Sequence, residues 1–135
     1  MYKGTIIEES LSDKSPLKKL NITSQRIEKV AKEHETPWLK KWTLDTVEIP
    51  EADIETIAHE LSLAIDRAHC ENWYCDFKNA NWHYIIFYNK IFKLNRQSPA
   101  DYKIMQEYAK SIGLPEHQTP TIYGIDKQEL ERTKN

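Results

Sequence analysis

Residues 75 to 83 bring together the side-chain types needed for nucleophilic catalysis. Cys75 could act as a nucleophile, His83 as its base and Asp76 as the orienting carboxylate, if each lies within hydrogen-bond reach of the next. His69 and Cys70 add two metal-ligand types nearby, but four residues separate Cys70 from Cys75, whereas structural zinc sites commonly use close pairs such as C-x-x-C. We therefore expect no metal site and no cofactor, and the catalytic reading depends on the strands that carry these residues.

The aromatic segment that contains them, WYCDFKNANWHYIIFYNKIFKLNR, covers residues 73–96 and is typical of three antiparallel strands. Its second turn, Tyr88-Asn89-Lys90-Ile91, fits a two-residue hairpin because Asn tolerates a positive φ. This turn predicts three pairs on one face: Phe87 with Phe92, Ile85 with Leu94, and His83 with Arg96.

The first turn, which contains Asn79-Ala80-Asn81, allows two registers. A two-residue loop would place Tyr74, Asp76 and Lys78 beside Ile85 and Phe87, and buried charges without partners are costly. A three-residue loop instead aligns Trp73, Cys75 and Phe77 with Phe87, Ile85 and His83. Because a slip of one residue turns every side chain to the opposite face, the choice matters, and we predict the three-residue loop, with Asn81 in the left-handed conformation.

This register predicts which residues of the segment are core and which could bind a partner. Cys75 and His83 then face the core and Asp76 faces away, so we expect no catalytic triad. The core face would hold Trp73, Cys75, Phe77, His83, Ile85, Phe87, Phe92 and Leu94. The other face mixes aromatic and charged residues, which can stack a base or hold a peptide. Its candidate binding residues are Tyr74, Asp76, Lys78, Trp82, Tyr84, Tyr88 and Lys93, beside Ile86 and Ile91.

The first half of the chain supplies the remaining strands. The β-branched run at 5–7 predicts a strand over 3–9, and Ser15-Pro16 begins a short helix that reaches Leu20. Residues 22–30 fit neither the strand nor the helix period well. We favour a strand there, paired antiparallel through a long loop with a second strand over 42–49, whose sequence WTLDTVEI is rich in β-forming residues.

Two amphipathic segments predict the main helices. Apolar residues recur at three- and four-residue steps from Ile54 to Ala68, after a potential cap at Asp53, and Leu63 points away from this stripe. A second helix begins at Ser98-Pro99 and stops at Gly113-Leu114-Pro115, a sequence that supplies a left-handed cap and a block to continuation. The last segment, 119–135, is polar and reads as a loosely attached tail.

Composition narrows the classes of function. The chain has 135 residues with 19 Lys and Arg against 21 Asp and Glu, so a duplex DNA ligand is not expected. Three glycines, at 4, 113 and 124, form no phosphate-binding loop. No apolar run is long enough for a secretory signal or a membrane span, so we expect a cytoplasmic protein with reduced cysteines.

Several stretches together resemble a family of small uncharacterised proteins from bacteria and archaea that has no assigned activity. They are GTIIEESLSDKSPLKKL, WTLDTVEI, WYCDFKN followed by HYIIFYNKIFKL, and YAKSIGLPEHQ, and they span about residues 3 to 118. The resemblance implies no catalytic residue for this chain.

The sequence thus predicts one α+β domain over 1–118, with an antiparallel sheet of about six strands and two main helices packed on one face. We expect a binding module that contacts a protein partner, or a second copy of itself, through the aromatic sheet face or the tail. The alternative is a small RNA-binding or RNA-cleaving protein. It would need Lys78, Lys90, Lys93 and Arg96 to cluster beside the aromatic residues. A third hypothesis is that the protein is a hydrolase or a metal enzyme.

Overall fold

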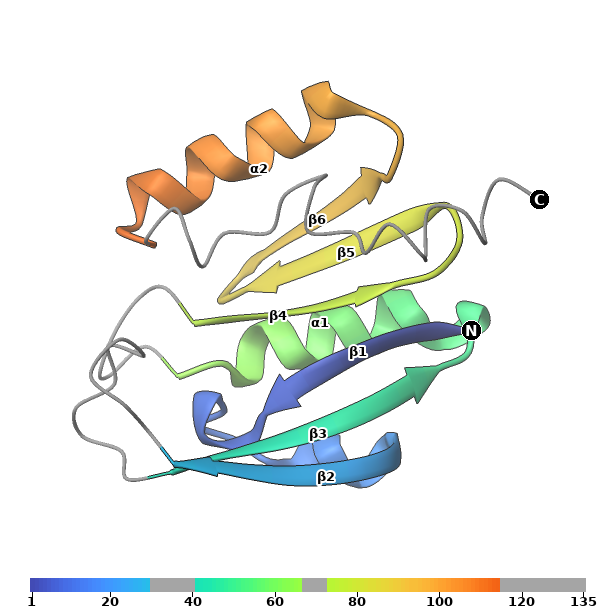
Figure 1. Cartoon of the computed structure of the whole chain (residues 1–135), viewed down its shortest axis with the longest axis vertical. Helices are drawn as coiled ribbons and strands as arrows, with labels where there is room; N and C mark the ends of the chain where they lie inside the picture. The colour runs from blue at the N-terminus through green and yellow to red at the C-terminus, as the bar shows by residue number, and fades with distance from the viewer. Residues whose placement is uncertain (30–40, 67–72, 115–135) are drawn as a thin grey trace.

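A computed structural model describes residues 1–29, 41–66 and 73–114 of the chain. Six antiparallel strands form one sheet in the order β2-β3-β1-β4-β5-β6, with β2 and β6 at its edges (Figure 1). The strands are β1 (Tyr2–Ile7), β2 (Asn21–Lys29), β3 (Lys41–Ile49), β4 (Tyr74–Lys78), β5 (Trp82–Phe87) and β6 (Lys90–Asn95). The predicted α+β class, with its antiparallel sheet of six strands and two helices, is confirmed.

The helices are α1 (Ile54–Ala64) and α2 (Pro99–Ser111). Short 3-10 turns, η1 (Glu8–Ser10), η2 (Ser15–Lys19) and η4 (Glu51–Asp53), lie between the strands and before α1. The short helix predicted from Ser15 and the pairing of β2 with β3 are both confirmed. Among the described residues, no helix combines the length and the apolar character needed to cross a membrane.

Helix α1 buries Ile54, Ala58 and Leu61 of the predicted stripe and leaves Leu63 54% exposed. It ends before the predicted Ala68, because Ile65 is extended and forms a bridge with Leu11. The backbone N–H of Asp66 then donates to the carbonyl of Ser10, so pairing with the segment after β1 replaces the last helical turn. Ala68 itself lies outside the described residues.

Helix α2 begins and ends as its sequence predicts. Ser98 accepts a hydrogen bond from the N–H of Asp101, which caps the first turn. Gly113 adopts a φ of 84°, and Leu114 folds back so that its N–H donates to the carbonyl of Ala109. The side chain of Leu114 is buried with the apolar face of α2.

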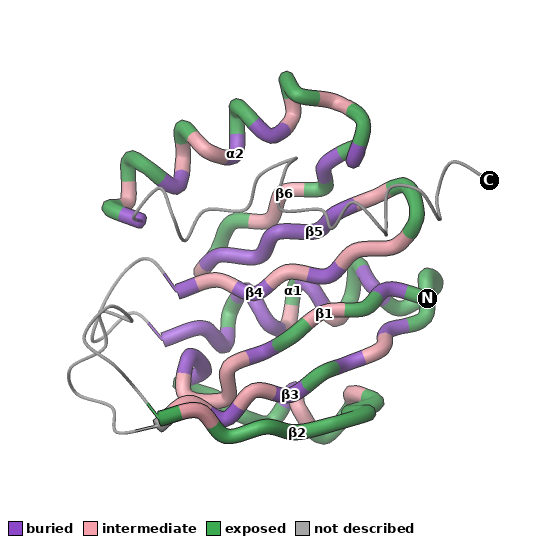
Figure 2. The backbone as a smooth tube through the Cα atoms, viewed as in Figure 1, coloured by how far each residue is buried: buried purple, intermediate pink, exposed green. Residues whose placement is uncertain are grey.

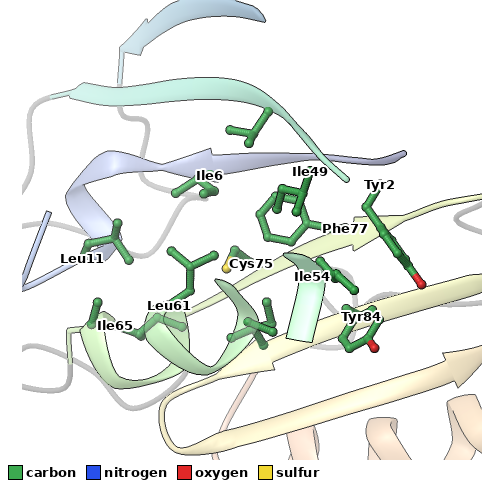
Figure 3. Packing of buried hydrophobic residues seen from close by; sticks show 14 of the residues in the cluster. Tyr2, Ile6, Leu11, Ile49, Ile54, Leu61, Ile65, Cys75, Phe77 and Tyr84 are labelled. Atoms are coloured by element: carbon green, nitrogen blue, oxygen red, sulfur yellow. The ribbon is translucent and has the colours of Figure 1, made fainter. Parts of the chain in front are cut away.

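The two helices pack on different sides of the sheet, which is where the structure departs from the expected arrangement. Consecutive side chains of a strand point to opposite faces. Tyr84 and Ile86 of β5 belong to the core cluster of α1, whereas Ile85 and Phe87 belong to that of α2. We call these the α1 face and the α2 face. Figure 1 shows α1 behind β1 and β4, and Figure 3 shows its apolar residues packed with Cys75 and Phe77.

The predicted register between β4 and β5 is wrong by one residue. Asp76 lies opposite Ile85 and Lys78 opposite His83, so the loop contains only two residues, Ala80 and Asn81. The side chain of Asn79 accepts hydrogen bonds from the N–H groups of Asn81 and Trp82, which holds this tight turn together. The prediction of a three-residue loop rests on the cost of burying Asp76 without a partner. In the structure Asp76 does have a partner and remains partly exposed.

The hairpin between β5 and β6 keeps the predicted faces but not the predicted partners. Ile85 lies opposite Phe92 and His83 opposite Leu94, so the turn residues are Tyr88 and Asn89, one position earlier than expected. Asn89 has the expected positive φ, of 52°. The shift is an even number of residues, so Ile85, Phe87, Phe92 and Leu94 still share one face.

Candidate functional site

Asp76, His83 and Tyr102 form a chain of hydrogen bonds that joins β4, β5 and α2. Nε2 of His83 lies 2.6 Å from Oδ2 of Asp76, and Nδ1 of His83 lies 2.9 Å from the hydroxyl of Tyr102. His83 and Tyr102 are buried, whereas 36% of the Asp76 side chain is exposed. Solvent therefore reaches this chain of hydrogen bonds at the carboxylate of Asp76.

The direction of each proton between Asp76, His83 and Tyr102 follows from which of these groups carries a proton. Burial raises the pKa of Tyr102 to about 12, so its phenol is protonated at neutral pH. With neutral imidazole, the phenol donates to Nδ1 of His83, and Nε2–H donates to Asp76. Both ring nitrogens of His83 are thus engaged in hydrogen bonds within the protein. The chain orients Asp76 and links α2 to the sheet.

Cys75 lies on the α1 face and cannot join His83 and Asp76. Its thiol is buried, and burial raises its pKa far above the ordinary value, so the reactive thiolate is disfavoured. The expectation that Cys75 is a core residue is confirmed. The expectation that Asp76 faces away from His83 is wrong, because the corrected register puts both on the α2 face.

The predicted binding residues divide between the two faces of the sheet. Tyr74, Asp76 and Lys78 share the α2 face with His83. The other four lie on the α1 side or at the turn: Trp82, Tyr84, Tyr88 and Lys93. Among these, Nζ of Lys93 lies 4.5 Å from the ring centre of Trp82, but Tyr84 is buried against Tyr2. The single aromatic surface expected from the sequence is therefore not formed.

The basic residues of β6 and its following turn do not form a patch. Lys90 lies over the rings of Phe92 and Tyr108 on the α2 face, whereas Lys93 lies over Trp82 on the other face. Arg96 is buried, and its guanidinium donates to the backbone carbonyl of Asn79 beside the β4–β5 turn. The clustering that the RNA alternative requires is absent from these three residues.

A second polar cluster joins η1 to the strands β3 and β2. Nε2 of Gln25 lies 2.9 Å from both Oε2 of Glu8 and Oδ1 of Asp45. Asp45 is fully buried, and its Oδ2 lacks a conventional hydrogen-bond donor among the described residues. A hydrogen bond with Asp45 raises the pKa of Glu8, and burial and the charges of Asp45 and Glu9 act in the same direction. A proton on Glu8 thus stabilises the pair of carboxyl groups.

The raised pKa of Glu8 predicts a pH dependence of stability. The folded state holds this proton more tightly than the unfolded state, so the contribution of Glu8 is fully present below its unfolded pKa and is lost as the pH rises through the folded pKa. Glu8→Gln keeps a hydrogen-bond donor without titrating. We therefore expect the stability of this variant, relative to the unmodified chain, to increase from about pH 4 to about pH 8, measured by urea unfolding.

Asp13 provides a control of opposite sign. Hydrogen bonds from Ser15 lower the pKa of Asp13, so its contribution is present above the unfolded pKa and is lost as the pH falls. The stability of Asp13→Asn relative to the unmodified chain should therefore decrease as the pH rises. If Glu8→Gln follows the same trend as Asp13→Asn, the proposed proton on Glu8 is wrong.

Strand β2 is the most exposed of the described strands. It is nine residues long, it pairs on one side only with β3, and all but one of its residues are exposed (Figure 2). Its sequence predicted the strand but not its place at the edge of the sheet, because strand order depends on contacts between distant segments. We consider this edge the main candidate for an interaction surface.

Metal binding finds no support in the described residues, among which no group of three or more His, Cys, Asp or Glu side chains is arranged to hold an ion. His69 and Cys70 lie outside them. Comparisons of the chain with protein-family models, curated proteins and solved structures find no match.

Proposed function

We propose that the protein is an interaction module that binds another polypeptide in extended conformation along the edge strand β2. The observation that carries the proposal is an exposed strand that pairs through eight of its nine residues with β3 and, among the described residues, with no strand on its other side. The backbone N–H and C=O groups on the free side of an edge strand can accept a further strand.

Two exposed isoleucines provide side-chain contacts for such a partner. Ile22 and Ile27 are 39% and 60% exposed. A register shift between Ile22 and Ser24 changes the alternation, so Ile22 lies opposite Val47 and Ile27 opposite Thr43. Val47 and Thr43 are an even number of residues apart on β3, and both isoleucines therefore lie on the α1 face. A strand added to β2 could contact both of them with its own apolar residues.

The aromatic surface expected from the sequence supports binding less well. Tyr84, Ile85 and Ile86 are buried because the two helices cover opposite faces of β5. RNA binding has less support than either surface, because the basic side chains of Lys90 and Lys93 lie on different faces of the sheet.

Peptide selection tests the proposal. Peptides selected from a random displayed library against the intact protein should include sequences that slow amide hydrogen exchange in β2 when they bind. Ile27→Lys should weaken the binding of these peptides about tenfold or more, because a charged side chain at an edge opposes strand addition. Binding is measured by the fluorescence anisotropy of labelled peptides.

Ile104 offers a matched control, because it is also 60% exposed but lies on α2. Ile104→Lys should leave peptide affinity unchanged. The proposal is wrong if the selection yields no peptide that protects β2, or if the two variants weaken binding equally.

A further inference from the structure

We propose that the polypeptide accepted by β2 is a second copy of this chain, which pairs antiparallel with its own β2 about a two-fold axis at Ile27. This inference rests on the proposed strand-pairing function and names the partner. The pairing would extend the two sheets into one continuous sheet across the edge.

The first argument is the charge pattern on the face opposite α1. Arg26 and Glu28 share this face, because they lie opposite Leu44 and Trp42 of β3. They are two residues apart, on either side of Ile27. In an antiparallel pair centred on Ile27, each Arg26 lies opposite Glu28 of the other copy, so opposite charges meet twice. The two side chains already form an ion pair within the chain, with an N···O distance of 3.0 Å, and the second copy would extend it into a network of four charges.

The second argument concerns the α1 face. The two copies of Ile27, each 60% exposed in the single chain, would lie directly opposite one another and cover apolar surface. Gln25 and Lys29 lie on the same face as Ile27 and would pair with each other across the axis. Gln25 is hydrogen-bonded to Glu8 and Asp45. The Lys29 ammonium of the second copy would therefore approach an acidic cluster.

The third argument is that neighbouring registers are unfavourable. A two-fold axis perpendicular to the sheet puts the α1 faces of the two copies on the same side of the joined sheet. The axis must then pass through a residue of β2, and moving it to the next residue shifts the pairing by two residues. Centring the pair on Arg26 places the two copies of Arg26 opposite each other, and centring it on Glu28 does the same for Glu28. Like charges directly opposite destabilise strand pairs. Centring on Gln25 avoids this but brings the irregular segment between Ile22 and Ser24 into the pair.

Residues 25–29 therefore favour one register through their own charges. Because the contact is short, we expect a reversible dimer of weak affinity, visible by sedimentation equilibrium between about 10 µM and about 1 mM chain. Ile27→Lys should abolish the dimer, since two lysines would meet at the axis, whereas Ile104→Lys should not affect it.

A charge exchange tests the register itself. Arg26→Glu leaves two acidic side chains on the face, and Glu28→Arg leaves two basic ones, so each variant alone should dimerise about tenfold or more weakly. An equimolar mixture of the two variants should form a heterodimer, because every pair is again of opposite charge. Each chain also loses its internal ion pair, so urea unfolding of both single variants is measured to show that they remain folded.

The outcomes separate this inference from the proposed function. If the unmodified chain remains monomeric at about 1 mM, or if its dimer survives Ile27→Lys, the second copy is not the partner. Peptides that still bind β2 in that case would leave the strand-pairing function intact. If the chain dimerises but the mixed variants do not associate, the proposed register is overturned.

Discussion

Gly4→Ala is expected to destabilise the fold by about 3 kcal/mol, the upper end of the usual cost of overpacking. Gly4 lies opposite Phe77 where β1 pairs with β4. A Cβ atom at this position would lie 2.0 Å from the carbonyl oxygen of Asp76 and 2.7 Å from the ring of Phe77. The nearer atom belongs to the backbone and cannot rotate away, so β1 and β4 would have to separate. Urea unfolding of the variant measures the loss.

Gly113→Ala is the comparison, because both variants make the same chemical change. Apart from its chain neighbours, no described residue has an atom within 4 Å of a Cβ at Gly113, but its φ of 84° requires the left-handed conformation. We expect a cost of about 1–2 kcal/mol, from backbone conformation alone. Equal losses for the two variants would contradict a steric conflict between β1 and β4.

Tyr102→Phe is expected to lower the free energy of unfolding by about 1–3 kcal/mol, the cost of leaving a buried polar atom without its partner. The substitution keeps the ring and removes only the hydroxyl that lies 2.9 Å from Nδ1 of His83. The imidazole is buried on the α2 face, so water does not readily replace the lost hydroxyl at that nitrogen. Urea unfolding measures the stability, and the NMR shifts of the two ring nitrogens report whether His83 keeps the proton on Nε2.

Tyr108→Phe is the matched control on the same helix. The ring of Tyr108 packs with Phe87 and Phe92, and its hydroxyl forms no hydrogen bond with the described residues. Loss of this hydroxyl should change the stability by less than about 0.5 kcal/mol. If Tyr108→Phe costs as much as Tyr102→Phe, the link from α2 through His83 to Asp76 contributes no specific stabilisation.

Local sequence signals predicted most of the elements. The helix α2 followed from Ser98, Pro99 and Gly113, because caps depend on residues within a few positions of the helix end. The pairing of β2 with β3 followed from β-forming composition. The end of α1 could not be predicted from local sequence, because the bridge between Ile65 and Leu11 joins segments far apart in the sequence.

The candidate site was predicted in its residues but not in its arrangement. Asp76 and His83 were recognised as chemically suited to one another, yet the rule against buried charges separated them. That rule failed because it treated Asp76 as unpartnered. A single cross-strand neighbour, His83, together with partial exposure, removed the penalty.

The sequence by itself determined the composition of the strands, the helix caps, the positive φ at Asn89 and the burial of Cys75, because each depends on side-chain type and near neighbours. The tertiary structure alone decided the register in which β4 pairs with β5, the placement of α1 and α2 on opposite faces of the sheet, and the edge position of β2. The physical reason is that the free energy of a strand face depends on what covers it. A helix on each side of β5 made both faces suitable for burial, and the alternating pattern could no longer specify one of them.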